Sequence, residues 1–117
     1  MKKIVLMLGF LCLVLGVHPA LAHPPGRLDL TFDVATHVLK VMLKHTTRDS
    51  IKHYINTIVV SLNKQDIITQ KFSSQKDNQG HEALYMILDV KPGDVLSVKA
   101  TCSLYGTKSE RFVIPSG

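Results

Sequence analysis

Apolar and polar residues alternate along most of the chain after residue 27. Every second residue is leucine, valine or phenylalanine over residues 28–32 and again over residues 39–43. A β-strand turns successive side chains to opposite faces, so this period of two predicts strands with one buried face. Strands are expected at residues 28–32, 37–45, 54–62, 67–72, 82–88, 95–103 and 108–114.

Polar segments separate the expected strands and read as turns or loops. Residues 46–52 and 73–80 are the longer ones, and Pro92-Gly93 has the composition of a tight turn. No helical period appears after residue 22. Seven short strands joined in this way predict an all-β fold, an immunoglobulin-like antiparallel β-sandwich. The chain has no tryptophan, and it lacks the cysteine pair of antibody-type domains.

The first 22 residues have the pattern of a signal peptide. Lys2 and Lys3 precede an apolar run over residues 4–17, and Ala20-Leu21-Ala22 fits a cleavage site. The apolar run is short for a transmembrane helix, which needs about 20 residues. The sequence therefore predicts an exported protein, periplasmic or secreted, with residues 23–117 as one sandwich domain and no membrane span in that part.

The charge balance favours small ligands over nucleic acid. The chain holds 14 Lys and Arg against 9 Asp and Glu, a net charge of +5. Without Lys2 and Lys3 the balance is 12 − 9 = +3, and charges of both signs are interspersed. A nucleic-acid surface needs a cationic cluster that is missing here, whereas a mild positive field suits a small anion.

One thiol remains after removal of the signal peptide, because Cys12 lies within it and Cys102 does not. Such a thiol is buried and inert, paired with another chain, or bound to a ligand. Cys102 has the inward parity of its strand, and His45 has the inward parity of residues 39–43. His53 lies where the polar loop meets the next strand. These strand ends are expected to meet at one pole of the sandwich, which makes His45, His53 and Cys102 candidate metal ligands. His23, the first residue after cleavage, is a fourth candidate. Imidazole and thiolate donors suit zinc, copper or iron.

The order of these residues adds a family resemblance. It is carried by Lys44-His45, by His53-Tyr54-Ile55 and by the segment 99–106, which reads KATCSLYG. This pattern resembles the iron domain of superoxide reductases and desulfoferrodoxins. The resemblance implies a seven-stranded immunoglobulin-like sandwich with a non-haem ferrous centre of four histidines and one axial cysteine. It also implies one-electron reduction of superoxide, with electrons from a donor protein.

By position, the resemblance makes His45 and His53 the second and third histidine ligands and Cys102 the axial ligand. His23, followed by two prolines, takes the place of the first histidine. Where the family has its fourth histidine, this chain has Tyr105, and its asparagine after the cysteine is Ser103. The ligand set is therefore one histidine short of the family's. Two alternatives stay open: a non-catalytic periplasmic binding or structural module with a degenerate metal site, and a Cys102 thiol that carries sulfur or pairs with another protein.

Overall fold

The structure of the protein is a computed structural model that describes residues 26–104 and 106–116. These residues form seven β-strands and no helix. The strands are β1 (Arg27–Asp33), β2 (Val38–Lys44), β3 (Ile55–Leu62), β4 (Gln65–Lys71), β5 (Gly80–Met86), β6 (Val95–Cys102) and β7 (Thr107–Val113). Accordingly, the described part holds no helix long and apolar enough to cross a lipid bilayer.

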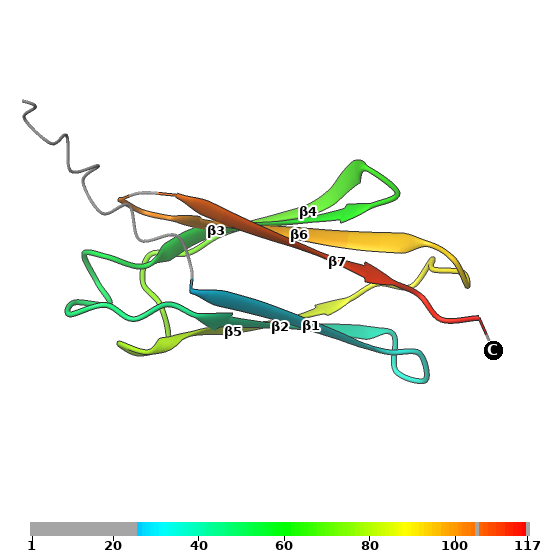
Figure 1. Cartoon of the computed structure of the whole chain (residues 1–117), viewed down its shortest axis with the longest axis horizontal. Helices are drawn as coiled ribbons and strands as arrows, with labels where there is room; N and C mark the ends of the chain where they lie inside the picture. Colours follow the sequence, from blue (N-terminus) through cyan, green and yellow to red (C-terminus); the bar gives the residue numbers. More distant parts are fainter. Residues whose placement is uncertain (1–25, 105, 117) are drawn as a thin grey trace, which may run out of the picture.

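Two antiparallel sheets face each other (Figure 1). One has the strand order β1-β2-β5 and the other β4-β3-β6-β7. The chain changes sheet between β2 and β3, between β4 and β5 and again between β5 and β6, while β4 stays beside β3 as a hairpin. The predicted all-β sandwich of seven antiparallel strands is confirmed.

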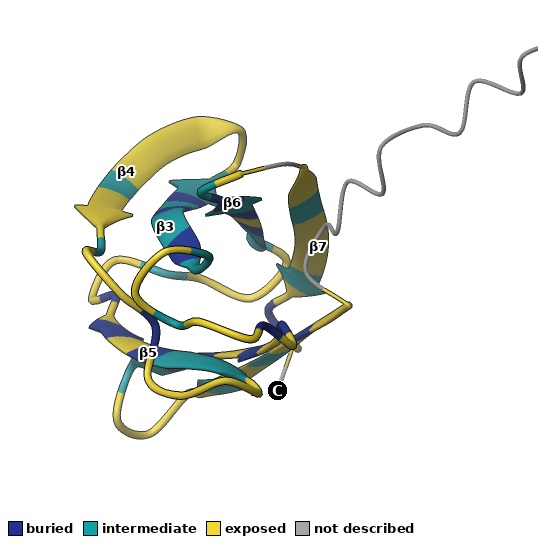
Figure 2. Ribbon diagram, turned by 90° about the vertical axis from the view of Figure 1, so that its left-hand side faces the viewer, coloured by how far each residue is buried: buried dark blue, intermediate teal, exposed yellow. Residues whose placement is uncertain are grey.

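The core lies between the sheets and is formed by the inward-facing residues of the central strands. In β2 and β6 every second residue is buried, and in β3 Ile55, Ile58 and Val60 are fully buried. Figure 2 looks along the strands and shows buried residues in strands of both layers. Burying these apolar side chains is the main favourable contribution to folding. The core residues are Leu28, Leu39, Val41, Leu43, Ile55, Ile58, Val60, Ala83, Tyr85, Ile87, Leu96, Val98, Ala100 and Ile114.

Strand boundaries differ from the sequence prediction mainly around β4. The expected turn at 63–66 shortens to Asn63 and Lys64, and β4 begins at Gln65. Asn63 and Lys64 have φ of 49° and 71°, as a two-residue hairpin turn requires. Asparagine tolerates this left-handed region better than most residues. Similarly, β5 begins at Gly80, two residues before the predicted strand.

Candidate metal centre

Three connections meet at one pole of the sandwich, at the left of Figure 1. They are the loop between β2 and β3, the loop between β4 and β5, and the turn between β6 and β7. The strand register fixes how they meet: Ile55, the first residue of β3, is paired with Cys102, the last of β6. In the other sheet Lys44, the last residue of β2, is paired with Gly80. His45 and Cys102 thus reach the same pole from opposite sheets.

His45, His53 and Cys102 form a cluster there, as was expected from strand ends that meet at one pole. Ligand-type atoms of the three side chains all lie within 4.8 Å of one another. His53 Nε2 is 3.0 Å from Cys102 Sγ. The His45 and His53 rings meet edge to face with their centroids 4.8 Å apart. Two imidazoles and one thiol at these separations are a donor set that suits a transition-metal ion.

Burial separates this group from a chance gathering on the surface. His45 is 1% exposed and Cys102 is 4% exposed, while His53 is half-buried. His45 Nδ1 is hydrogen-bonded to Gln75, but its Nε2 is buried and has no hydrogen-bond partner in the described part of the chain. A buried polar atom without a partner costs about 1–3 kcal/mol. A metal ion at Nε2 would remove that cost, so the donors present fit such an ion.

Other buried polar side-chain atoms among the described residues also lack partners, but none of them belongs to a group of three possible metal ligands. They are His37 Nδ1, Asn56 Oδ1, His81 Nε2 and Tyr85 Oη. His37 and His81 each pack edge-on against a phenylalanine ring, Phe32 and Phe72 respectively. Neither belongs to the cluster. Membership of the group of three possible ligands therefore singles out His45.

The β2–β3 loop fixes the position of His53 through a single turn of chain. The Asp49 carboxylate accepts hydrogen bonds from the backbone N–H groups of Ile51 and Lys52, at 3.0 and 3.3 Å. The Asp49 carbonyl accepts one from the His53 N–H at 2.8 Å. The imidazole emerges from this turn beside a hollow of about 560 Å³ that is also lined by residues 46–49. This hollow gives a small molecule a route towards His53.

Hydrogen bonds within the β6–β7 turn and to the residue before β3 fix the position of Cys102. Its backbone N–H donates to the Gly106 carbonyl at 3.0 Å, which closes the β6–β7 turn. Next to it, Ser103 and Tyr54 exchange two hydrogen bonds. The Ser103 N–H donates to the Tyr54 carbonyl at 2.8 Å, and Ser103 Oγ accepts from the Tyr54 N–H at 3.1 Å. Ser103, where the resemblance expected asparagine, thus joins the start of β3 to the end of β6.

Sequence reasoning missed Gln75. It lies in the polar 73–80 segment, yet it is only 4% exposed and contacts His45 directly. No signal in the sequence marks it, because loop residues follow no period that separates buried from exposed positions. A buried glutamine beside a candidate ligand is a feature that only the fold reveals.

Two positions relevant to the ligand set lie outside the described residues. They are His23, the fourth candidate ligand, and Tyr105, which replaces the fourth family histidine. His23 as a ligand therefore stays a prediction, as does the division into a signal peptide (1–22) and a mature domain (23–117).

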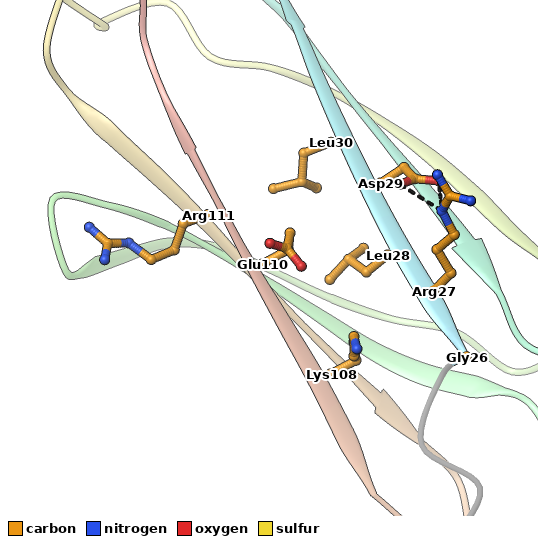
Figure 3. Close-up of a pocket in the computed structure, with 8 residues that line it drawn as sticks. All are labelled: Gly26, Arg27, Leu28, Asp29, Leu30, Lys108, Glu110 and Arg111. Carbon is orange, nitrogen blue, oxygen red and sulfur yellow. Dashed lines mark hydrogen bonds and ion pairs between the residues drawn. The ribbon is translucent and has the colours of Figure 1, made fainter.

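A second hollow, at the seam between β1 and β7, offers different chemistry (Figure 3). Leu28 and Leu30 point towards β7 there, and the Arg27 guanidinium turns away to pair with Asp29 at 2.9 Å. The Arg27–Asp29 pair is exposed, and the lining mixes both charges without histidine or cysteine. Its lining residues are Gly26, Arg27, Leu28, Asp29, Leu30, Lys108, Glu110 and Arg111. Among the described residues, the group of three possible metal ligands thus lies at the pole and not at this hollow.

No protein-family model matches this chain, and no curated protein shows significant sequence similarity to it. The likeness to superoxide reductases is therefore one of residue order around the cluster. It remains an interpretation to be tested by chemistry.

Proposed function

We propose that this protein is an exported metal-binding domain in which His45, His53 and Cys102 hold one transition-metal ion. The observation that carries the proposal is the convergence of these three side chains, with the buried Nε2 of His45 left without a partner. Neutral imidazoles add no charge and a thiolate adds one negative charge. The three residues would therefore leave a net charge of +1 on a divalent ion, which favours an anion as a further ligand.

Iron is the metal that the family resemblance supports. A bound iron would supply the one-electron chemistry by which superoxide, one electron and two protons give hydrogen peroxide, with the electron coming ultimately from a donor protein. The sulfur of Cys102 and the imidazole of His45 are buried away from water. This burial protects the thiol from oxidants dissolved in the solvent. The hollow beside His53 gives a small anion such as superoxide its route to the site.

Zinc and copper are the competing ions. Thiolate and imidazole sites bind Cu²⁺ and Zn²⁺ more tightly than Fe(II) when these ions are equally available. His23 would complete a set of three histidines and one cysteine, four donors of the types that bind zinc in tetrahedral sites. Zinc, which has no redox chemistry, would keep the binding site but exclude the redox role, whereas copper would keep the site and replace the redox couple of iron with its own.

A reactive thiol is the second candidate function, favoured by the 3.0 Å contact between His53 Nε2 and Cys102 Sγ. Reactive cysteines are partly exposed to their reaction partners, whereas Cys102 is buried. This burial favours metal binding over sulfur transfer or pairing with another protein.

The test is metal analysis of the chain that begins at His23, purified without oxygen, with a visible spectrum after mild oxidation. We expect about one iron per chain and a thiolate-to-iron charge-transfer band that Cys102→Ser abolishes. Metal at a hundredfold excess over its dissociation constant should add about 2.7 kcal/mol to the free energy of unfolding. His37→Asn, which changes a histidine outside the cluster, should keep both the ion and the stabilisation.

Other outcomes discriminate between the candidates. Stoichiometric zinc would retain the site and refute the superoxide-reducing role, and stoichiometric copper would retain the site and refute the assignment of iron. A chain that loads none of these ions, with a thiol that forms mixed disulfides, would replace metal binding with the reactive-thiol function. A chain that loads no ion and has an inert thiol would be a binding or structural module with a degenerate site.

A further inference from the structure

The amide of Gln75 is fixed in one orientation by the backbone around it. Its Nε2 lies 2.8 Å from the His45 carbonyl oxygen and 2.7 Å from the Asp77 carbonyl oxygen. Carbonyl oxygens only accept hydrogen bonds, so the group facing them must be the NH₂. A reversed amide would place its oxygen against two carbonyl oxygens and its NH₂ against the Ile55 N–H. The orientation is therefore fixed without reference to the imidazole.

This orientation determines where His45 carries its proton. Gln75 Oε1 accepts from the Ile55 N–H at 3.3 Å and lies 2.8 Å from His45 Nδ1. Because an amide oxygen cannot donate, Nδ1 must be the donor. A neutral imidazole carries one N–H, so Nε2 of His45 holds the lone pair. Nε2 is the same buried atom that has no partner among the described residues.

In His81, on β5, the roles of the two ring nitrogens are reversed. Its Nδ1 accepts a hydrogen bond from the Lys76 N–H at 3.0 Å. The neutral His81 ring therefore carries its proton on Nε2. Two histidines contacted by neighbouring residues of one loop, Gln75 and Lys76, are thus held in opposite tautomers. The contrast shows that the tautomer of each ring is set by its local contact.

We propose that Gln75 is the positioning residue of the metal site: it holds His45 in the Nδ1–H tautomer so that Nε2 is ready to bind the ion. This inference rests on the proposed metal-binding function and assigns a specific role to a residue that does not itself touch the ion. Residues behind a metal-bound histidine orient the ring and fix its tautomer. Gln75 does so with a neutral group, so it adds no charge to the two imidazoles and the thiolate.

The role requires an amide. A carboxylate at this position would accept from His45 Nδ1 equally well, but its second oxygen would face the carbonyl oxygens of His45 and Asp77 at hydrogen-bond distance. An apolar side chain would fill the space and leave the Ile55 N–H, the His45 carbonyl and Nδ1 without this partner. Glutamine satisfies all the groups that meet here, since it donates through one end and accepts through the other.

The first measurement is the tautomer of each histidine in the metal-free chain labelled with ¹⁵N, read from long-range ¹H–¹⁵N NMR. The sample is kept at about pH 8, where an ordinary imidazole is neutral. We expect Nδ1–H for His45 and Nε2–H for His81. In Gln75→Met, His45 should shift towards Nε2–H while His81 keeps its tautomer. Gln70→Met, on the exposed outer strand β4, is the matched control and should change neither ring.

The second measurement is the Zn²⁺ dissociation constant of the same proteins. Gln75→Met should weaken Zn²⁺ binding by about 10–100-fold, the usual effect of removing a group that orients a metal-bound histidine. Gln70→Met should bind as the parent does.

Several results would overturn the inference. One is an Nε2–H tautomer of His45 in the parent chain, which needs no variant and so holds even if Gln75→Met fails to fold. Another is a Gln75→Met protein that keeps the Nδ1–H tautomer or the parental affinity for Zn²⁺. Failure of the parent chain to bind any metal is a different result. It would refute the proposed function and with it the positioning role, while the tautomer data would still report whether Gln75 controls the ring.

Discussion

The two poles of the sandwich differ in whether the hydrogen-bonding groups of their polar side chains all have partners. At the turn pole, opposite the cluster, Asn63 Nδ2 donates to Asp94 Oδ1 at 3.0 Å and Asn63 Oδ1 accepts from the Val95 N–H at 3.0 Å. Asp94 Oδ2 accepts from the Lys91 N–H at 2.8 Å. At the cluster pole, by contrast, His45 is more deeply buried than any of these residues and keeps one nitrogen without a partner.

Under the proposed function, this difference separates polar groups that stabilise the fold from polar groups that would bind a ligand. The Asn63–Asp94 network joins two turns and leaves both side chains satisfied. The His45–Gln75 network satisfies every group except the one atom that a metal ion would take. Buried polar groups are normally hydrogen-bonded, so an exception beside a second imidazole and a thiol indicates a functional rather than a structural role.

Each pole also has a glycine, and these give the largest expected effects. A Cβ on Gly80, beside the cluster, would overlap the Leu43 carbonyl oxygen and lie 3.1 Å from the Leu43 carbonyl carbon. On Gly93, in the turn pole, a Cβ would meet nothing within 4 Å, but φ is +89°. Gly80→Ala should therefore lower the free energy of unfolding by about 3 kcal/mol through overpacking. Gly93→Ala should lower it by about 1 kcal/mol through backbone strain alone.

Urea denaturation of both variants measures this difference. Gly80→Ala should also weaken metal binding, because Gly80 is paired with Lys44, the residue before His45. An equal loss of stability in the two variants would show that the close approach of β5 to β2 relaxes easily.

The sequence predicted the cluster because strand parity extends across a whole strand. The alternation of residues 39–43 placed His45, the residue after β2, on the inward face. The alternation of residues 96–100 placed Cys102, the last residue of β6, on the inward face as well. Both residues are buried. The meeting of these strand ends followed from the general geometry of a sandwich, in which antiparallel strands end at common poles. The prediction thus succeeded where a periodic rule applied.

The rest of the site depends on contacts that no period encodes. Gln75 is 30 residues from His45 in the chain, and its burial arises because the 73–79 loop folds over the start of β3. The role of Gly80 was equally hidden. Its place at the end of the polar 73–80 segment indicated a turn or loop, whereas its main constraint is contact with the backbone of β2. Loop residues such as these are placed by the tertiary fold, so only the structure identifies them.

Replacing one polar residue at each pole tests the contrast between them without metal. Asn63→Ala removes two side-chain hydrogen bonds and puts alanine at a φ of 49°. The free energy of unfolding should fall by about 1–2 kcal/mol. His45→Leu loses the hydrogen bond to Gln75 but also removes the unpartnered nitrogen. The two effects offset each other, so its metal-free stability should stay within about 1 kcal/mol of the parent.

Asn63→Gly is the control that separates the two parts of the first effect, because glycine accepts the positive φ but makes no side-chain hydrogen bonds. Metal should still stabilise both Asn63 variants by the parental increment and should not stabilise His45→Leu. A metal-free His45→Leu protein that loses more stability than Asn63→Ala would mean that His45 is mainly a structural residue.

The smallest effects concern the pH dependence of stability, which should also differ between the poles. Burial, with a further contribution from the Lys76 charge, lowers the pKa of His81 below its ordinary 6.5. The hydrogen bond from Asn63, followed by that from Lys91, lowers the pKa of Asp94 below 3.8. In both cases the unfolded chain takes up the proton first, so acidification favours unfolding. The contribution of His81 is complete above pH 6.5 and is lost as the pH falls through the folded-state pKa. That of Asp94 is complete above pH 3.8 and is lost at lower pH.

Metal-free unfolding curves across this pH range distinguish the two residues. His81→Asn keeps an acceptor for the Lys76 N–H but does not titrate, so stability should fall less than in the parent between about pH 7 and pH 5. Asp94→Asn should reduce the fall below about pH 4 and leave the higher range unchanged. If either substitution altered the pH dependence in the other's range, the two poles would be coupled through the sandwich. Their separate titration would instead show that the cluster pole and the turn pole respond to protons independently, as their separate hydrogen-bond networks predict.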